Sequence, residues 1–183
     1  MNRFFLFFLI SFFFSCEKQS YQIGDIFFQD LDCGPPCQAI EAVTSGYQGA
    51  QLSHCAIITS IGTSNYDTIL TEAIGETVTQ TTLHDFLNRS NKVFVGRLKD
   101  EYQYMIPDAI AYIQTDLNGK PYDYIFDIND DTYYCSEIIY EGLKKADNTQ
   151  ELFSLKPMTF NEPGTDSPFV HWVEYYEELG HPI

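Results

Sequence analysis

The chain has 183 residues, with 26 acidic and 10 basic side chains, and its formal net charge is −16 at pH 7. Such an acidic surface repels polyanions, so we expect no nucleic-acid partner and no electrostatic attraction to anionic lipid headgroups. The length is that of one domain with a core of ordinary size, and the sequence shows no internal repeat.

The chain begins with a segment typical of a secretory signal peptide. Arg3 precedes an apolar run from Phe4 to Phe14, which is shorter than the roughly 20 residues of a transmembrane helix. The small residue before Cys16 resembles the lipobox of bacterial lipoproteins, although Phe13 stands where leucine is usual.

We therefore expect residues 1–15 to be removed and Cys16 to carry lipid, so that the protein is anchored to a membrane of the cell envelope. Residues 16–22 would form a tether and residues 23–183 the folded domain. An ordinary signal peptide beside a coincidental cysteine is the alternative.

The spacing of apolar residues in the remaining chain predicts a mixture of strands and helices. Strands cluster in the middle of the chain between helices, which favours an α+β domain built on an antiparallel sheet. The predicted elements are a strand at 25–29, a helix from Pro36, strands at 53–60, 67–74 and 76–82, a short helix at 83–90, a strand at 91–99, helices at 103–117 and from Ser136, and a last amphipathic helix at 169–179.

Two cysteines flank a Gly-Pro-Pro turn near the first predicted helix. Cys33 and Cys37 are close enough in sequence for a local disulfide if the turn permits. A zinc site formed by Cys33, Cys37, His54 and Cys55 is the alternative. The adjacency of His54 and Cys55 argues against zinc, because neighbours on a strand point to opposite faces.

A third cysteine stands where the acidic and tyrosine-rich segment "DDTYYCSEIIYEG" turns into a helix. Cys135 is therefore predicted at a helix N-terminus, where unpaired N–H groups stabilise a thiolate. A buried, inert cysteine is the plain alternative.

A nucleophilic cysteine needs a base, and His54 is the best placed of four histidines because it begins a predicted strand. His84, His171 and His181 lie in a short helix, in the tail helix and beside the C-terminus. If the turn between the predicted strands at 53–60 and 67–74 has an odd number of residues, residues whose numbers add up to 126 pair across the hairpin. His54 then lies directly opposite Glu72. A carboxylate there would orient the imidazole, whereas an exposed strand glutamate is the alternative.

The segments "GDIFFQ", "SHCAII", "TEAIG", "VGRLK" and "GKPYDYIFDINDDTYYCSEIIYEG" resemble, in that order, the permuted papain-like amidases of the YiiX/YaeF type. These amidases belong to the NlpC-like cysteine hydrolase superfamily. The resemblance runs from Gly24 to Gly142, and the order His, Glu, Cys is that of the permuted branch. It implies a circularly permuted papain-like (NlpC-like) fold with an antiparallel sheet packed against helices.

Carried over residue by residue, the resemblance implies that Cys135 is the nucleophile, His54 its base and Glu72 the orienting residue. Tyr122 matches a tyrosine near the oxyanion site. Cys55, next to the base, departs from the usual pattern, as does the "DCGPPC" pair, and both raise the question of redox control.

These features predict a lipid-anchored cell-envelope cysteine hydrolase that cleaves an amide bond, without metal or organic cofactor. The expected substrate is a peptidoglycan-type peptide or a related acyl amide, and the acidic surface favours a peptide with a free amine. A lipid acyltransferase or thioesterase with the same three residues is one alternative, and a long apolar groove beside Cys135 would favour it. A non-catalytic wall-binding lipoprotein is the other.

The tail at 152–179 carries many apolar residues, which we expect to pack on the domain because burying each is worth roughly 1.5–3 kcal/mol. Either it shapes the pocket of Cys135 or it covers apolar surface far from it. The residues expected to be buried are Phe153, Met158, Phe160, Phe169, Trp172 and Tyr175.

Overall fold

The structure is a computed structural model that describes residues 20–44, 46–90, 92–147, 152–155 and 159–181. The predicted signal peptide and Cys16 lie outside these residues. Within them, no helix is both long and apolar enough to cross a membrane.

A five-stranded antiparallel sheet forms the centre of the fold, with strand order β4-β3-β2-β1-β5. The predicted strand at 91–99 is shortened to four residues, and β5 pairs with β1 at the edge of the sheet. The strands are β1 (Ile26–Gln29), β2 (His54–Ser60), β3 (Ile69–Ile74), β4 (Thr77–Thr82) and β5 (Val93–Gly96).

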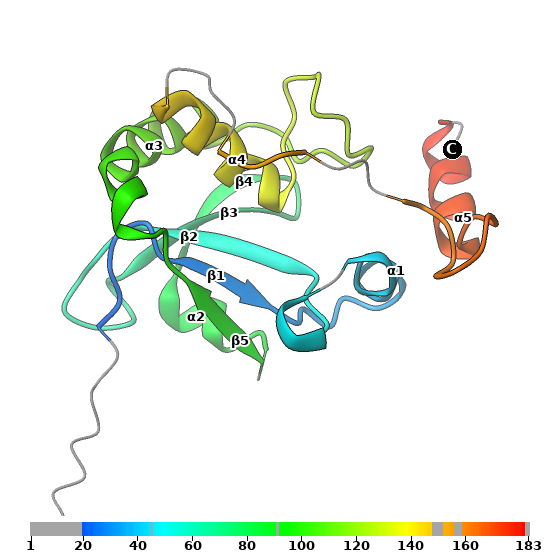
Figure 1. The fold of residues 1–183 in the computed structure, drawn as a ribbon, viewed down its shortest axis with the longest axis horizontal. Coiled ribbons are helices and arrows are strands. Elements are labelled where there is room, and N and C mark those ends of the chain that lie inside the picture. The colour runs from blue at the N-terminus through cyan, green and yellow to red at the C-terminus, as the bar shows by residue number, and fades with distance from the viewer. Residues whose placement is uncertain (1–19, 45, 91, 148–151, 156–158, 182–183) are drawn as a thin grey trace, which may run out of the picture.

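Helices cover both faces of this sheet, with α3 and α4 on one face and α2 on the other (Figure 1). Together the sheet and its helices confirm the predicted α+β class. The helices are α1 (Pro35–Val43), α2 (Leu83–Leu87), α3 (Ile106–Tyr112), α4 (Cys135–Ala146) and α5 (Val170–Leu179), with further short helical turns at Tyr47–Gly49, Asp100–Met105 and Ile113–Leu117.

Side chains of β2 alternate between the two faces and so contribute to two separate cores. Cys55 and Ile57 join the core beneath α3 and α4, whereas Ala56 and Ile58 join the core that contains Phe86 of α2. The two faces of the sheet come together at the beginning of β2. There the N-terminus of a helix on one face lies close to a side chain that belongs to the other face.

The C-terminal helix packs on α1, and a third apolar cluster lies between them. Trp172 is 1% exposed there and Tyr176 is 5% exposed, so the prediction that the tail packs on the domain is confirmed for α5. The expectation for Phe153 is wrong, because this side chain is 45% exposed. It follows α4 on a short stretch outside the third cluster, and Met158 lies outside the described residues.

Candidate active site

Cys135 is the first residue of α4. The helix is held on the sheet by Ile138 and Leu143, which are buried, and the carboxyl group of Glu137 accepts a hydrogen bond from the backbone N–H of Tyr134 at 3.3 Å. The N–H groups of a first turn have no helical acceptor and favour negative charge. The position therefore favours the thiolate of Cys135 over the thiol.

His54, the first residue of β2, contacts Glu72 of β3. The distance from His54 Nε2 to Glu72 Oε2 is 2.6 Å, and the two residues are 7% and 0% exposed. The imidazole lies beside the ring of Phe86, with 6.2 Å between the ring centroids. Because Nε2 is engaged by the carboxylate, Nδ1 is the ring nitrogen that remains for another partner.

The predicted contact is present, but the predicted register is wrong. Ile57 pairs with Thr71, so paired numbers add up to 128 rather than 126, and the register shifts again at a bulge next to Ser60. Glu72 is therefore a diagonal neighbour of His54 instead of the directly opposite residue. A displacement by two keeps both side chains on one face of the sheet, and diagonal neighbours remain within reach of long side chains.

Glu72 is itself held by two side chains that the sequence analysis did not identify. Arg89 Nη2 and Thr81 Oγ1 each donate a hydrogen bond to Glu72 Oε1 at 2.5 Å. Burial raises the pKa of Glu72, but the hydrogen bonds from His54, Arg89 and Thr81 outweigh this effect and lower it below its ordinary value. Glu72 is thus an anion at neutral pH, although it is fully buried.

Cys135 and His54 influence each other's protonation. Burial lowers the pKa of His54, but hydrogen bonds to Cys135 and Glu72 outweigh burial and raise it to about 9. The pKa of Cys135 is held well below its ordinary value by hydrogen bonds from Cys55 and His54. At neutral pH the pair is a thiolate and an imidazolium, which is the form a cysteine nucleophile needs.

Cys55 is a second thiol at the same place. A hydrogen bond to Cys135 and complete burial both raise the pKa of Cys55 well above its ordinary value. Cys55 therefore stays protonated at neutral pH and its S–H donates to the Cys135 thiolate. Cys55 therefore contributes a hydrogen-bond donor to Cys135.

Tyr122 and Cys135 both line one cavity of the protein. The backbone N–H of Tyr122 donates to the carbonyl oxygen of Glu76, and Tyr122 forms a β-bridge with Tyr133, two residues before Cys135. Burial, together with the charge of Cys135, raises the pKa of the Tyr122 phenol. The hydroxyl therefore keeps its proton and can act as a donor.

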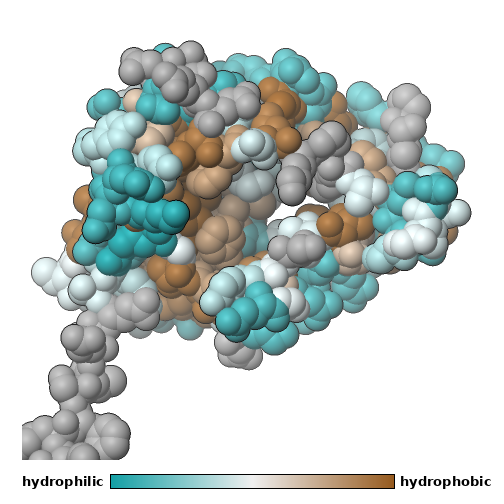
Figure 2. Space-filling model, in the orientation of Figure 1, coloured by the Kyte–Doolittle hydropathy of each residue, from teal (hydrophilic) through white to brown (hydrophobic). Residues whose placement is uncertain are grey.

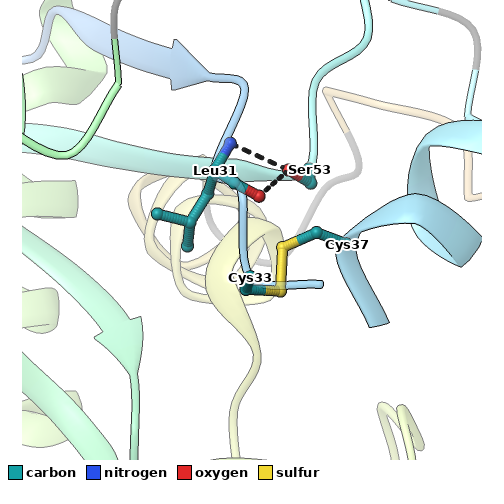
Figure 3. The surroundings of a disulfide bond; sticks show 4 residues. All are labelled: Leu31, Cys33, Cys37 and Ser53. Atoms are coloured by element: carbon teal, nitrogen blue, oxygen red, sulfur yellow. Dashed lines mark hydrogen bonds between the residues drawn. A yellow bond between two sulfur atoms is a disulfide. The ribbon is translucent and has the colours of Figure 1, made fainter. Parts of the chain in front are cut away.

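The possible disulfide between Cys33 and Cys37 is present, with 5.4 Å between their Cα atoms (Figure 3). It lies at the start of α1, close to Ser53, whose hydroxyl accepts from the backbone N–H of Leu31 and donates to its carbonyl. The zinc alternative is not assembled, because both cysteines are consumed by the disulfide. Over the described residues, no three or more His, Cys, Asp or Glu side chains form a group suited to a metal ion.

A cavity of about 380 Å³ opens at Cys135. Cys135, His54 and Tyr122 lie on its wall, and most of its other lining is aromatic or aliphatic. Figure 2 shows hydrophobic side chains gathered in the middle of one face of the molecule, where the surface is hollowed. The site thus combines an ionised cysteine with an apolar environment.

A cysteine on a helix N-terminus that meets a strand histidine and a buried acid is the arrangement of papain-like cysteine hydrolases. The family model described as "Permuted papain-like amidase enzyme, YaeF/YiiX, C92 family" matches residues 20–179. The chain belongs to this family, and it is a cysteine hydrolase with a permuted papain-like fold.

One solved structure with the same fold is that of the metalloprotein YiiX from Escherichia coli O157:H7. The two chains are 28% identical with a TM-score of 0.51, and the match covers 68% of the present chain and 66% of YiiX. The match therefore spans slightly less than two thirds of that relative. No curated protein matches the chain.

Proposed function

We propose that the protein hydrolyses an amide bond with Cys135 as nucleophile, His54 as general base and acid, and Glu72 as the residue that orients His54. The observation that carries this proposal is that His54 bridges a buried carboxylate at 2.6 Å and a cysteine whose pKa is lowered. A structural histidine would not require a buried anion on one side and a thiolate on the other.

In the first half of the reaction the Cys135 thiolate attacks the amide carbonyl carbon. The C–N bond then breaks, the imidazolium of His54 gives its proton to the leaving amine, and the acyl group remains on Cys135 as a thioester. In the second half His54, now neutral, takes a proton from water, whose oxygen attacks the thioester. The products are a carboxylic acid and the regenerated Cys135–His54 pair.

In this proposal two donors stabilise the negative charge that develops on the carbonyl oxygen. One is the backbone N–H of Cys135, which has no acceptor within the first turn of α4. The other is the hydroxyl of Tyr122, which stays protonated. Donors that are fixed before the reaction stabilise the transition state without reorganisation.

The setting of this reaction is proposed from the sequence. The predicted signal peptide and the predicted lipidation of Cys16 support a lipid-anchored enzyme of the cell envelope, with substrates drawn from peptidoglycan-type peptides or acyl amides. The same three residues would also serve a lipid acyltransferase or thioesterase. The non-catalytic alternative has less support, because the nucleophile, the base and the acid are all adjacent.

Trapping the thioester tests this proposal. The protein is incubated with a mixture of muropeptides and N-acyl amines, quenched with acid, and analysed by intact and peptide mass spectrometry. We expect an acyl adduct on Cys135 in the parent and none in Cys135→Ala. A hydrolysis rate that is equal in the parent and in Cys135→Ala would contradict the assignment.

A further inference from the structure

Two free thiols lie together in the part of the chain that the structure describes. Cys33 and Cys37 are joined to each other, whereas Cys55 and Cys135 are free. Cys55, the second residue of β2, and Cys135, the first of α4, line the same cavity and pack in the same apolar core. The proposed hydrolysis assigns no bond-making step to Cys55, so its thiol is chemically unused.

The sulfur atoms of these two cysteines are hydrogen-bonded to each other. The S–H of Cys55 donates to the sulfur of Cys135, which is also hydrogen-bonded to the imidazole of His54. A disulfide forms only where two sulfur atoms can approach to about 2.05 Å. A pair that is already hydrogen-bonded has little distance left to cover, so Cys55 and Cys135 are suitably placed for this bond.

The two thiols differ in exposure and in charge. Cys135 is partly exposed, whereas Cys55 is 4% exposed. At neutral pH Cys135 is a thiolate and Cys55 keeps its proton. Oxidants react with thiolates that solvent can reach and much less with buried, protonated thiols. A small oxidant that enters the cavity therefore reacts with Cys135 before Cys55.

We propose that Cys135 is a site of reversible oxidation by a small hydroperoxide, and that Cys55 is the thiol that converts the oxidised cysteine into a disulfide. The oxidation requires only the two cysteines and His54, so it goes beyond the proposed function. Its consequence, the loss of amide hydrolysis while Cys135 is in the disulfide, rests on that function.

In the first step the Cys135 thiolate attacks an oxygen of the hydroperoxide. An S–O bond forms and the O–O bond breaks, so that Cys135 becomes a sulfenic acid and is oxidised by two electrons. The other oxygen leaves and takes a proton from the imidazolium of His54. The hydroperoxide is thereby reduced to an alcohol, or to water if it is hydrogen peroxide.

In the second step the sulfur of Cys55 attacks the sulfur of the Cys135 sulfenic acid. The S–S bond forms as the S–O bond breaks, and the hydroxyl group leaves as water with the proton of the Cys55 thiol. The hydrogen bond to the Cys135 thiolate and the charge of that thiolate both raise the pKa of Cys55. Both effects end when the sulfenic acid forms, so Cys55 ionises more readily at the point where it must react.

The contact with Cys55 also limits further oxidation of Cys135. A sulfenic acid that persists in the presence of peroxide becomes a sulfinic acid, which dithiols do not reduce. A disulfide is instead returned to two thiols by a dithiol reductant. We therefore expect oxidation of the parent protein to be reversible because the second thiol is adjacent.

Peptide mass spectrometry of the full-length protein tests the proposal without an activity assay. The protein is reduced, freed of reductant and treated with a small excess of hydrogen peroxide at neutral pH. Remaining thiols are blocked with N-ethylmaleimide, and the digest is analysed without reduction. We expect the peptides that contain Cys55 and Cys135 to be joined by a disulfide, with complete loss of Cys135 alkylation by iodoacetamide in the linked molecules. Dithiothreitol should reverse both changes.

Cys55→Ser is the informative variant, because its hydroxyl keeps a hydrogen-bond donor but cannot form a disulfide. Each protein is compared with its own untreated sample. In Cys55→Ser we expect about tenfold more sulfinic acid on Cys135 than in the parent, and dithiothreitol should not restore its alkylation. Thr59→Ser, further along β2, is the control for a conservative change in the same strand and should form the disulfide as the parent does.

The outcomes separate this inference from the proposed function. The inference is overturned if Cys135 does not react with peroxide, if it becomes sulfinic acid in the parent without a link to Cys55, or if it links to other cysteines instead. The measurement on the parent decides this even if Cys55→Ser does not fold. A thioester trapped on Cys135 together with no Cys55–Cys135 disulfide would leave the proposed function intact. A disulfide that forms in a protein whose Cys135 traps no thioester would support the oxidation site and contradict the proposed function.

Discussion

The protonation states of single residues decide whether this site can act at neutral pH. Cys135 and His54 shift each other's pKa in opposite directions, because each stabilises the charged form of the other. The reactive pair exists between the two pKa values: below the lower one the thiolate is protonated, and above about 9 the imidazolium loses its proton.

We predict that Cys135 is alkylated by iodoacetamide at a rate that is already maximal below neutral pH. The reason is that its thiolate is present there, whereas an unperturbed thiol ionises near pH 8.5. Cys55 should react much more slowly at every pH up to 8, because it is buried and its pKa is raised. A Cys135 profile with its midpoint above pH 8 would contradict the assignment.

We predict that Glu72→Gln lowers kcat strongly and leaves the fold intact. The amide keeps the size of the side chain and one acceptor, but it cannot stabilise the imidazolium of His54 as an anion does. Loss of an orienting carboxylate costs up to roughly 10⁴-fold in a serine triad. Thr79→Ser, at the position that pairs with Glu72 across β3 and β4, is the control, and unchanged kcat in Glu72→Gln would show that the carboxylate is structural.

The sequence predicted that Cys135, His54 and Glu72 lie together, as they do in the structure, but it did not predict the side chains that hold them. His54 and Glu72 could be brought together from strand parity alone, because an error of two in register leaves both on one face. Arg89 and Thr81 could not be predicted, since their contacts depend on how far β4 extends and on how α2 leaves the sheet. The contact of Cys55 with Cys135 could not be predicted either, because it depends on the position of α4 over the beginning of β2.

At the scale of elements, α4 carries the proposed nucleophile and also a buried acid. Glu137 is 2% exposed, and burial, with smaller contributions from Asp123 and Glu141, raises its pKa to about 8. Its carboxyl is thus protonated in the folded protein at neutral pH, while it would be ionised in the unfolded chain. The first turn of α4 thus contains a carboxyl group that loses its negative charge when the protein folds.

We predict that the stability of the Glu137→Gln variant, relative to that of the parent protein, increases as the pH rises from 4.5 to 8. In the parent the folded state keeps a proton that the unfolded state releases above its ordinary pKa, so this group's contribution to stability falls with increasing pH and reaches its minimum above pH 8. Glutamine keeps an acceptor for the Tyr134 N–H and does not titrate. Urea denaturation of both proteins at several pH values measures the difference, and parallel curves would contradict the prediction.

The extents of the elements were predicted less well than their existence. α4 and α5 begin within one residue of the predicted starts, because an amphipathic pattern with clear flanking residues defines them. The predicted helix at 103–117 is instead divided into a 3₁₀ turn, α3 and a wider turn at Ile113–Leu117. Pro107, in the first turn of α3, restricts where regular helix can start.

At the scale of the whole molecule, the C-terminal tail is part of the fold, and its packing was predicted only in general. The apolar composition showed that it must be covered, but no local pattern reveals which surface it contacts. The tail contacts α1 and the loop that contains Phe126. Both segments contribute to the wall of the cavity at Cys135.

We predict that Trp172→Ala destabilises the protein by about 3–5 kcal/mol, because it removes a large side chain that is 1% exposed. Thermal unfolding checks the loss of stability. Val170→Ala, on the exposed side of the same helix, is the matched control and should change stability by no more than about 0.5 kcal/mol. Equal stability of the two variants would show that α5 contributes little to the fold.

We also predict that Cys16→Ser releases the protein from membranes. The expected reason is loss of a lipid on Cys16, and metabolic labelling with a fatty-acid analogue followed by membrane fractionation measures it. A parent protein recovered from the soluble fraction with an unmodified N-terminus would contradict this prediction and leave the catalytic proposal unaffected.

The order of the site residues along the chain has a kinetic consequence for folding. His54 and Glu72 are 18 residues apart and meet within one hairpin, which is a local contact that closes rapidly. Cys135 reaches them only after a much longer loop has closed and α4 has docked on the sheet. The ion pair of His54 and Glu72 can therefore form before Cys135 reaches it, and we expect Cys135 to lack its activating contacts during that interval. Activation of the cysteine is in this sense the last folding step of the site, and it reports that the two layers of the domain have come together.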